Sequence, residues 1–185
     1  MTFLASDITY EFTANNELLE QYFAIREECL RKEWGLVDYS GARDKNDLDG
    51  HILVAIKDNV CIGGARWIPA PLTDRKLLHI ESENFKLTDF FPGLKQYNYC
   101  EFGRLAVASN ERQQGKVARD LLSCLLVKAR ECFMDFLIFE IDKLKDSRFR
   151  QIFADIGIDI ERQDVDMSFL TCYHPAELAL YIAKL

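Results

Sequence analysis

The sequence has few of the residues that build metal centres and disulfide frameworks. It holds three histidines, and its six cysteines form no C-x-x-C pair and no Cys/His cluster with zinc-site spacing. We therefore expect free thiols, buried where their neighbours are apolar, and no metal. Four cysteines have such apolar neighbours: Cys61, Cys100, Cys124 and Cys172.

Targeting and membrane signals are missing as well. No apolar run has the length of a membrane span, and residues 1–10 lack the basic start of a secretory signal while already containing Asp7. A cytoplasmic protein without a membrane span is the expectation that follows.

Glycine and proline are scarce, at nine and four in 185 residues, and this excludes a disordered or fibrous chain. With 49% hydrophobic and 29% charged residues the composition is globular, and the length predicts a single domain over residues 1–185. The formal net charge of −7 repels nucleic acid except where cations gather locally. We expect no nucleic-acid partner, and the oligomeric state stays open.

Two common phosphate-binding motifs do not occur. The dinucleotide fingerprint G-x-G-x-x-G needs three glycines, whereas the turn 112–116 contains only Gly115, and the sequence G-x-x-x-x-G-K-[ST] is missing. The three histidines share no catalytic spacing with a nucleophile, so serine or cysteine hydrolase chemistry is unsupported too.

Apolar periodicity predicts strands alternating with helices. Asp58-Asn59 indicates a hairpin turn, Asn15 or Asn16 a helix N-cap, and residues 35–50 a polar, turn-rich loop. An irregular excursion is expected over 69–96, where three of the four prolines lie. We predict strands over 8–13, 51–56, 60–68, 97–108, 135–141, 158–162 and 165–173, and helices over 16–34, 116–133, 143–156 and 175–185.

The segment 101–122 carries the clearest chemical signal. A strand ends in the turn Arg112-Gln113-Gln114-Gly115-Lys116 and leads directly into a helix, so unpaired backbone N–H groups gather at the positive end of the helix dipole. Such a turn favours an anion, and the cations of the segment favour a phosphate-bearing ligand. The structural alternative is a solvated basic turn.

These residues resemble the GNAT superfamily of N-acyltransferases, whose pyrophosphate turn reads R/Q-x-x-G-x-G/A. Residues 103–107 and 63–67 and the element order are similar to the same superfamily, over roughly residues 8–160. The resemblance implies an α/β (α+β) fold: a central, mixed but mostly antiparallel twisted sheet of about seven strands, splayed at its fourth and fifth strands, with helices on both faces. It also implies acyl-CoA or acetyl-CoA as co-substrate, bound by Leu105, Ala106, Val107, Arg112, Gln113, Gln114, Gly115, Lys116, Val117 and Ala118.

A narrower pattern is similar to acyl-homoserine-lactone synthases, which make autoinducers for quorum sensing, and to N-acyl amino acid synthases. Its positions are Arg26, Trp34, Asp47, Asp49 and Arg66, followed by Glu101-Phe-Gly-Arg104 after the long excursion. The resemblance implies that the first five contact an amine-bearing acceptor and that Glu101 and Arg104 are catalytic.

Acyl transfer to an amine gives these residues roles. Glu101 can act as the general base, directly or through water. The resemblance implies that backbone N–H groups within 105–107 bind the thioester oxygen. Arg26, Arg66 and Arg104 with Asp44, Asp47 and Asp49 form either an ion-pair cluster that orders the loop 35–50 over the acceptor or a purely structural network.

The donor has two candidates. Val117 stands where the superfamily has a small residue and disfavours tight CoA packing, whereas a basic surface suits an acidic acyl carrier protein and its phosphopantetheine. That surface comprises Arg112, Lys116, Arg119, Lys128 and Arg130. We therefore expect an autoinducer-synthase-like N-acyltransferase, the alternatives being an acetyl-CoA-dependent N-acetyltransferase and a non-catalytic module that binds an acyl ligand or a partner.

Overall fold

A computed structural model describes residues 2–5, 7–33, 35–82, 85–112, 115–165 and 178–185. Its contacts divide the chain into two compact units, which we call unit 1 (residues 1–67 and 103–125) and unit 2 (residues 68–102 and 126–185). The expectation of a single acyltransferase domain over residues 1–185 stays a prediction.

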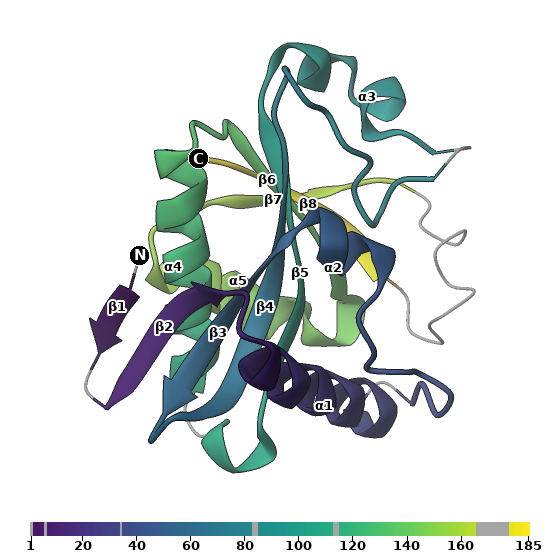
Figure 1. The fold of residues 1–185 in the computed structure, drawn as a ribbon. Coiled ribbons are helices and arrows are strands. Elements are labelled where there is room, and N and C mark those ends of the chain that lie inside the picture. The colour runs from purple at the N-terminus through teal and green to yellow at the C-terminus, as the bar shows by residue number, and fades with distance from the viewer. Residues whose placement is uncertain (1, 6, 34, 83–84, 113–114, 166–177) are drawn as a thin grey trace. The chain divides into compact units, whose positions relative to one another are not determined.

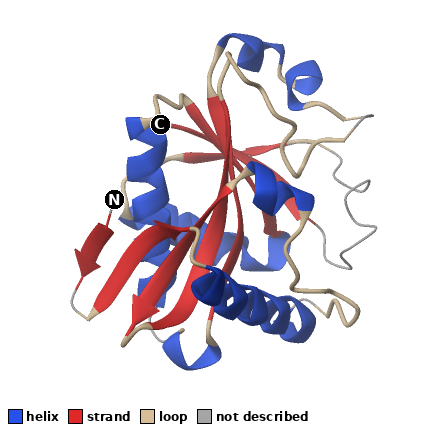
Figure 2. Cartoon of the chain, viewed as in Figure 1, coloured by secondary structure: helices blue, strands red, loops and turns tan. Residues whose placement is uncertain are grey.

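The described strands form a sheet in the order β1-β2-β3-β4-β5-β6-β8-β7, with eight strands where the sequence predicted about seven (Figure 2). Both β4 and β5 run from one unit into the other. Two of these strands, β1 and β8, were not predicted. The bounds are β1 Thr2–Ala5, β2 Ile8–Thr13, β3 His51–Lys57, β4 Val60–Ala70, β5 Tyr99–Val107, β6 Phe136–Asp142, β7 Ile160–Gln163 and β8 Leu178–Lys184.

In unit 1 the strands β1 to β4 form an antiparallel meander. The hairpin between β3 and β4 turns at Asp58 and Asn59, whose φ angles of 51° and 64° are those of a two-residue turn of the mirror-image type. The predicted hairpin is confirmed. The helix α1 (Asn16–Glu33) begins after Asn15, whose side chain accepts a hydrogen bond from the backbone N–H of Glu17 at 2.9 Å.

Helices cover both faces of the unit 1 sheet (Figure 1). On one face Tyr22 of α1 packs in the core cluster with Ile52 and Val54 of β3. On the other, buried Tyr10 of β2 donates a hydrogen bond to Asp120, at 2.8 Å, from the first half of α4 (Lys116–Glu131). The expected arrangement of a sheet between helices is confirmed here.

Unit 2 contains the parallel pairing of the sheet. The ladder between β5 and β6 joins Tyr99–Glu101 to Phe136–Ile138, although β5 continues to Val107 and β6 to Asp142. This short ladder is the splay that the GNAT resemblance implied. Next to it, β6, β8 and β7 pair antiparallel. The Phe139 ring stacks on Phe153 of α5 (Asp146–Asp155), with centroids 4.7 Å apart.

The C-terminal helix predicted over 175–185 is wrong, because Leu178–Lys184 form the strand β8. Leucine and alanine favour a helix locally, but here they are buried between β6 and β7 and pair with both strands. The predicted loop 35–50 contains the helix α2 (Lys45–Asp49). Residues 143–145 are a 3₁₀ turn (η4) ahead of α5. The predicted strand 165–173 lies almost wholly outside the described residues.

The excursion between β4 and β5 has the short, irregular structure expected of it, with α3 (Leu87–Phe90) and the 3₁₀ helix η1 (Pro92–Gln96). A further 3₁₀ turn, η2 (Ser109–Glu111), follows β5. The five described cysteines are free, and all except Cys132 are buried. Among the described helices, none combines the length and the apolar character that crossing a membrane requires.

Candidate functional site

A buried cluster of two arginines and two aspartates lies in unit 1. Arg26 of α1 donates two hydrogen bonds of 2.9 Å to the two carboxylate oxygens of Asp47. Arg66 of β4 approaches Asp47 at 3.3 Å and Asp44 at 3.2 Å. Since Arg26 and Arg66 are each 1% exposed and the Asp47 side chain is fully buried, these charged groups contact one another in place of water.

The electrostatics of Asp47 follow from this packing. Burial raises the pKa of its carboxyl, but the hydrogen bonds and the charge of Arg26, assisted by the Asp44 backbone N–H and by Arg66, outweigh burial and lower it overall. Asp47 is therefore ionised at neutral pH, and the bidentate geometry to Arg26 is that of the strongest carboxylate pairs.

The local sequence explains why the two aspartates lie together. Asp44 is the N-cap of α2: its side chain accepts from the Asp47 N–H at 2.8 Å, and Asp47 accepts from the Asp44 N–H at 2.9 Å. This reciprocal capping box starts a helix of five residues. Arg26 also donates to the carbonyls of Gly41 and Ala42, both at 3.0 Å. The cluster thereby fastens the loop 41–47 to α1 and β4.

Arg104 gives β5 an irregular backbone. Its φ of 56° is in the left-handed region, which non-glycine residues rarely enter within a strand. Its carbonyl accepts a 2.6 Å hydrogen bond from the hydroxyl of Tyr22, and its guanidinium lies 5.5 Å from the centre of the Tyr39 ring. A strand residue held in such a conformation redirects the backbone that follows it, here residues 105–107.

In the turn that follows β5, the side chains of Arg112 and Lys116 bond to other groups of unit 1. Arg112 donates from Nε to the Val107 carbonyl at 2.6 Å, and its Nη2 lies 3.0 Å from the Cys29 sulfur. Gly115 has a φ of 66°, which accounts for glycine at the start of α4. Lys116 pairs with Asp120 at 2.9 Å. Two of the five cations predicted to form a docking surface are thus engaged within unit 1.

Glu101 lies in unit 2, on the first half of β5. It is 2% exposed, and its Oε2 accepts a hydrogen bond from the Ile80 backbone N–H at 3.3 Å. A carboxylate in such an enclosed place is a candidate for proton transfer only where a substrate reaches it. The excursion residue Ile80, itself fully buried, is one of the groups around it.

The remaining predicted residues divide into three groups. Trp34, Gln113 and Gln114 lie outside the described residues. Asp49 ends α2 and is half-buried, and Asp44 bonds to Arg66. Along β5 and the start of α4, Ala106, Val107 and Val117 are buried, and Leu105 and Ala118 are half-buried.

Two residues that sequence reasoning overlooked belong to this site. Tyr22 reaches the Arg104 carbonyl, and Gly64 makes room for its ring, because a Cβ at Gly64 would lie 2.7 Å from the ring. The Gly63-Gly64 pair in an otherwise β-rich run was the available signal, since glycine inside a strand marks a close approach.

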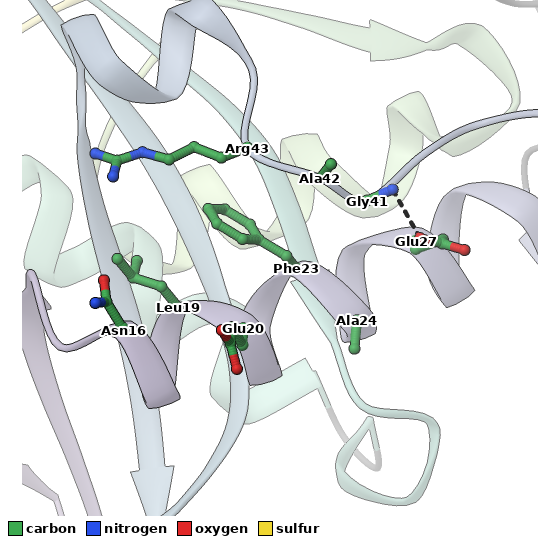
Figure 3. A pocket seen from close by; sticks show the side chains of 9 residues that line it. All are labelled: Asn16, Leu19, Glu20, Phe23, Ala24, Glu27, Gly41, Ala42 and Arg43. Atoms are coloured by element: carbon green, nitrogen blue, oxygen red, sulfur yellow. Dashed lines mark hydrogen bonds between the residues drawn. The ribbon is translucent and has the colours of Figure 1, made fainter.

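A pocket of about 470 Å³ opens beside α1, over Phe23 and under Arg43 (Figure 3). The loop residue Gly41 closes one side of it, held by a 2.8 Å hydrogen bond from its N–H to Glu27. None of the predicted site residues that the structure describes lines this pocket. A second pocket, of about 300 Å³, shares Leu19 and Arg43 with the first and includes Asp47.

The fold of this chain matches those of several solved structures. No family model and no curated protein matches the sequence. Among solved structures, the AHL synthase LasI matches with a TM-score of 0.65 at 12% identity, over 97% of this chain and 91% of that one. A ribosomal-protein-alanine N-acetyltransferase from Brucella melitensis matches with a TM-score of 0.59 at 18% identity, over 95% of this chain and 99% of that one. An N-acetyltransferase from Staphylococcus aureus Mu50 matches with a TM-score of 0.61 at 16% identity, over 97% of this chain and 99% of that one. The chain has the GNAT fold that its sequence predicted.

Proposed function

We propose that the protein is an N-acyltransferase that moves an acyl group from a thioester donor to the amine of a small molecule, as an autoinducer synthase does. The observation that carries this proposal is the left-handed Arg104 inside β5, three residues after a buried Glu and shortly before the basic turn 112–116. A strand with these features offers redirected N–H groups to an oxyanion and ends at a phosphate site.

The reaction follows from ordinary acyl-transfer chemistry. The neutral amine nitrogen of the acceptor attacks the thioester carbonyl carbon, Glu101 accepts a proton from that nitrogen as the C–N bond forms, and N–H groups within 105–107 stabilise the oxyanion. The C–S bond then breaks and the thiolate leaves without needing a protonated side chain, because thiolates are stable leaving groups. Arg112 fixes the end of β5 through the Val107 carbonyl, and Gly115 lets the backbone approach the donor phosphate.

The acceptor side of the proposal rests on the cluster of Arg26, Asp44, Asp47 and Arg66. Those residues bond to one another, so we assign them the ordering of the loop 41–47 rather than direct chemistry on the acceptor. The likeness to LasI supports the autoinducer-synthase version of the proposal.

Acetyl-CoA is the donor in the second candidate function. One matched structure, of yncA from Salmonella typhimurium, is described with its cofactor acetyl-CoA, at 16% identity and a TM-score of 0.57. An acyl carrier protein remains the donor of the first candidate, although Lys116 and Arg112 contribute less to a docking surface than expected, because both are engaged. A non-catalytic binding module is the third candidate.

Thermal-shift measurements with acetyl-CoA, a long-chain acyl-CoA and an acylated carrier protein separate these candidates. A ligand at one hundred times its Kd stabilises the folded state by about 2.7 kcal/mol. Stabilisation by the long-chain or carrier-bound donor supports the first candidate, and stabilisation by acetyl-CoA alone supports the second. Donor binding without thiol release, in wild type and Glu101→Gln alike, would support the third candidate, the non-catalytic binding module.

A further inference from the structure

Tyr22 connects α1 to the irregular point of β5. Its side chain is fully buried, and its hydroxyl donates a 2.6 Å hydrogen bond to the carbonyl of Arg104, the one described β5 residue with a positive φ. A strand carbonyl ordinarily accepts from a neighbouring strand, whereas the donor of this bond is a helix side chain.

The position of the Tyr22 ring is fixed by its neighbours. A Cβ placed on Gly64 would lie 2.7 and 3.0 Å from two ring atoms, and 2.6 Å from the Leu53 carbonyl oxygen. The ring therefore rests directly on the β4 backbone, where only glycine leaves space. Burial also raises the pKa of Tyr22, so its hydroxyl keeps the proton that it donates.

The backbone beyond Arg104 is held from the other side as well. A Cβ on Gly63 would lie 2.8 Å from the Ala106 carbonyl oxygen, and the Ala108 N–H donates to the Ile62 carbonyl at 2.9 Å. Residues 105–107 thus have two fixed ends, the Tyr22 bond at Arg104 and the β4 contact at residues 106–108. The direction of their N–H groups is set by both.

We infer that Tyr22 is a positioning residue for acyl transfer: through the Arg104 carbonyl, its hydroxyl aims the N–H groups of residues 105–107 at the thioester oxygen. This inference rests on the proposed function. Losing one oxyanion donor costs about 10² to 10³ in kcat in enzymes where it has been removed, and misplacing one costs less. We expect Tyr22→Phe to lower kcat roughly 10- to 100-fold, with the KM for the donor unchanged.

The matched control is Tyr181→Phe. Tyr181 is also fully buried and donates one short hydrogen bond, 2.6 Å to Asp146, in unit 2. Both variants remove one hydroxyl from a packed ring, so both are expected to lose similar thermal stability, and only Tyr22→Phe is expected to lose kcat. Placing 4-aminophenylalanine at position 22 restores a donor of the same reach and is expected to recover most of the activity.

A readout independent of turnover tests the geometry itself. In ¹H–¹⁵N spectra, Tyr22→Phe is expected to shift the amides of Leu105, Ala106 and Val107, whereas Tyr181→Phe leaves them in place. If Tyr22→Phe does not fold, tetrafluorotyrosine at position 22 keeps the ring and loses its proton at a lower pH, and the same amides are expected to shift as it ionises.

The outcomes are distinct. Unshifted amides overturn the inference whether or not the protein is an enzyme. Turnover by wild type with an unchanged kcat in Tyr22→Phe, or an equal loss in Tyr181→Phe, overturns the inference and leaves the proposed function standing. Shifted amides without thiol release from wild type support the geometry and refute the proposed function, and with it the catalytic part of the inference.

Discussion

Replacing Asp47 with asparagine tests how much the unit 1 cluster stabilises the protein. The substitution removes the negative charge that faces Arg26 and Arg66, both 1% exposed. Among the described residues Asp47 is the only carboxylate bonded to Arg26, whose other acceptors are backbone carbonyls. The variant therefore leaves a buried guanidinium without a counter-charge, which costs about 3–5 kcal/mol in comparable cases.

Urea denaturation and a thermal melt followed by circular dichroism measure the effect. In a protein of this size 1 kcal/mol moves Tm by about 2–4 °C, so a fall in Tm on the order of 10 °C is expected. The control is Glu28→Gln, which breaks the pair between Glu28 and Lys32 at 2.8 Å, with side chains 45% and 73% exposed. Exposed pairs contribute little, so no measurable change is expected there. A loss below about 1 kcal/mol for Asp47→Asn would refute the reasoning.

Three further outcomes follow from the same structure. Because the folded-state pKa of Asp47 is lowered, its contribution to stability is present above its unfolded pKa of about 4 and is lost as pH falls further; wild type should lose stability in acid more steeply than Asp47→Asn, and parallel acid limbs would contradict this. Burial raises the pKa of Cys61 and Cys124 to about 11, so at pH 8 both thiols should resist alkylation by iodoacetamide in the folded protein. Peptide mapping should find them alkylated only after guanidinium chloride has unfolded the protein. Gly64→Ala, whose Cβ would lie 2.6 Å from the Leu53 carbonyl oxygen, should lower the free energy of unfolding by about 1–3 kcal/mol. A urea midpoint equal to that of wild type would argue against the close packing.

The parts of the fold set by local signals were predictable. The Asp58-Asn59 turn was predicted, and the helix cap was predicted at Asn15 or Asn16, of which the structure uses Asn15. Gly115 before α4 has a positive φ, which glycine adopts readily because it has no side chain. The strand β8 was not predictable in this way. Its sequence is apolar on both faces, and only pairing with β6 and β7 decides between strand and helix.

The candidate site shows the same division. The arginines and aspartates of unit 1 could be grouped from the sequence, and Arg26, Arg66, Asp44 and Asp47 do lie together. Their bonding pattern could not be foreseen, because it depends on how the capping box turns Asp47 inward. Tyr22 is not among the predicted site residues, because its hydrogen-bond partner is a backbone carbonyl 82 residues away in the sequence.

The measurement that tests the central claim most directly is mass spectrometry of lipid-soluble products from cells that overexpress the protein, beside cells that overexpress Glu101→Gln. It reports the acyl chain and the amine in one mass. We expect a new N-acyl species with wild type and a strong fall in its level with Glu101→Gln. Substituting Asp146, a carboxylate outside the proposed machinery, by asparagine is expected to leave that level unchanged. No new N-acyl species with wild type, or the same species at the same level with Glu101→Gln, would contradict it.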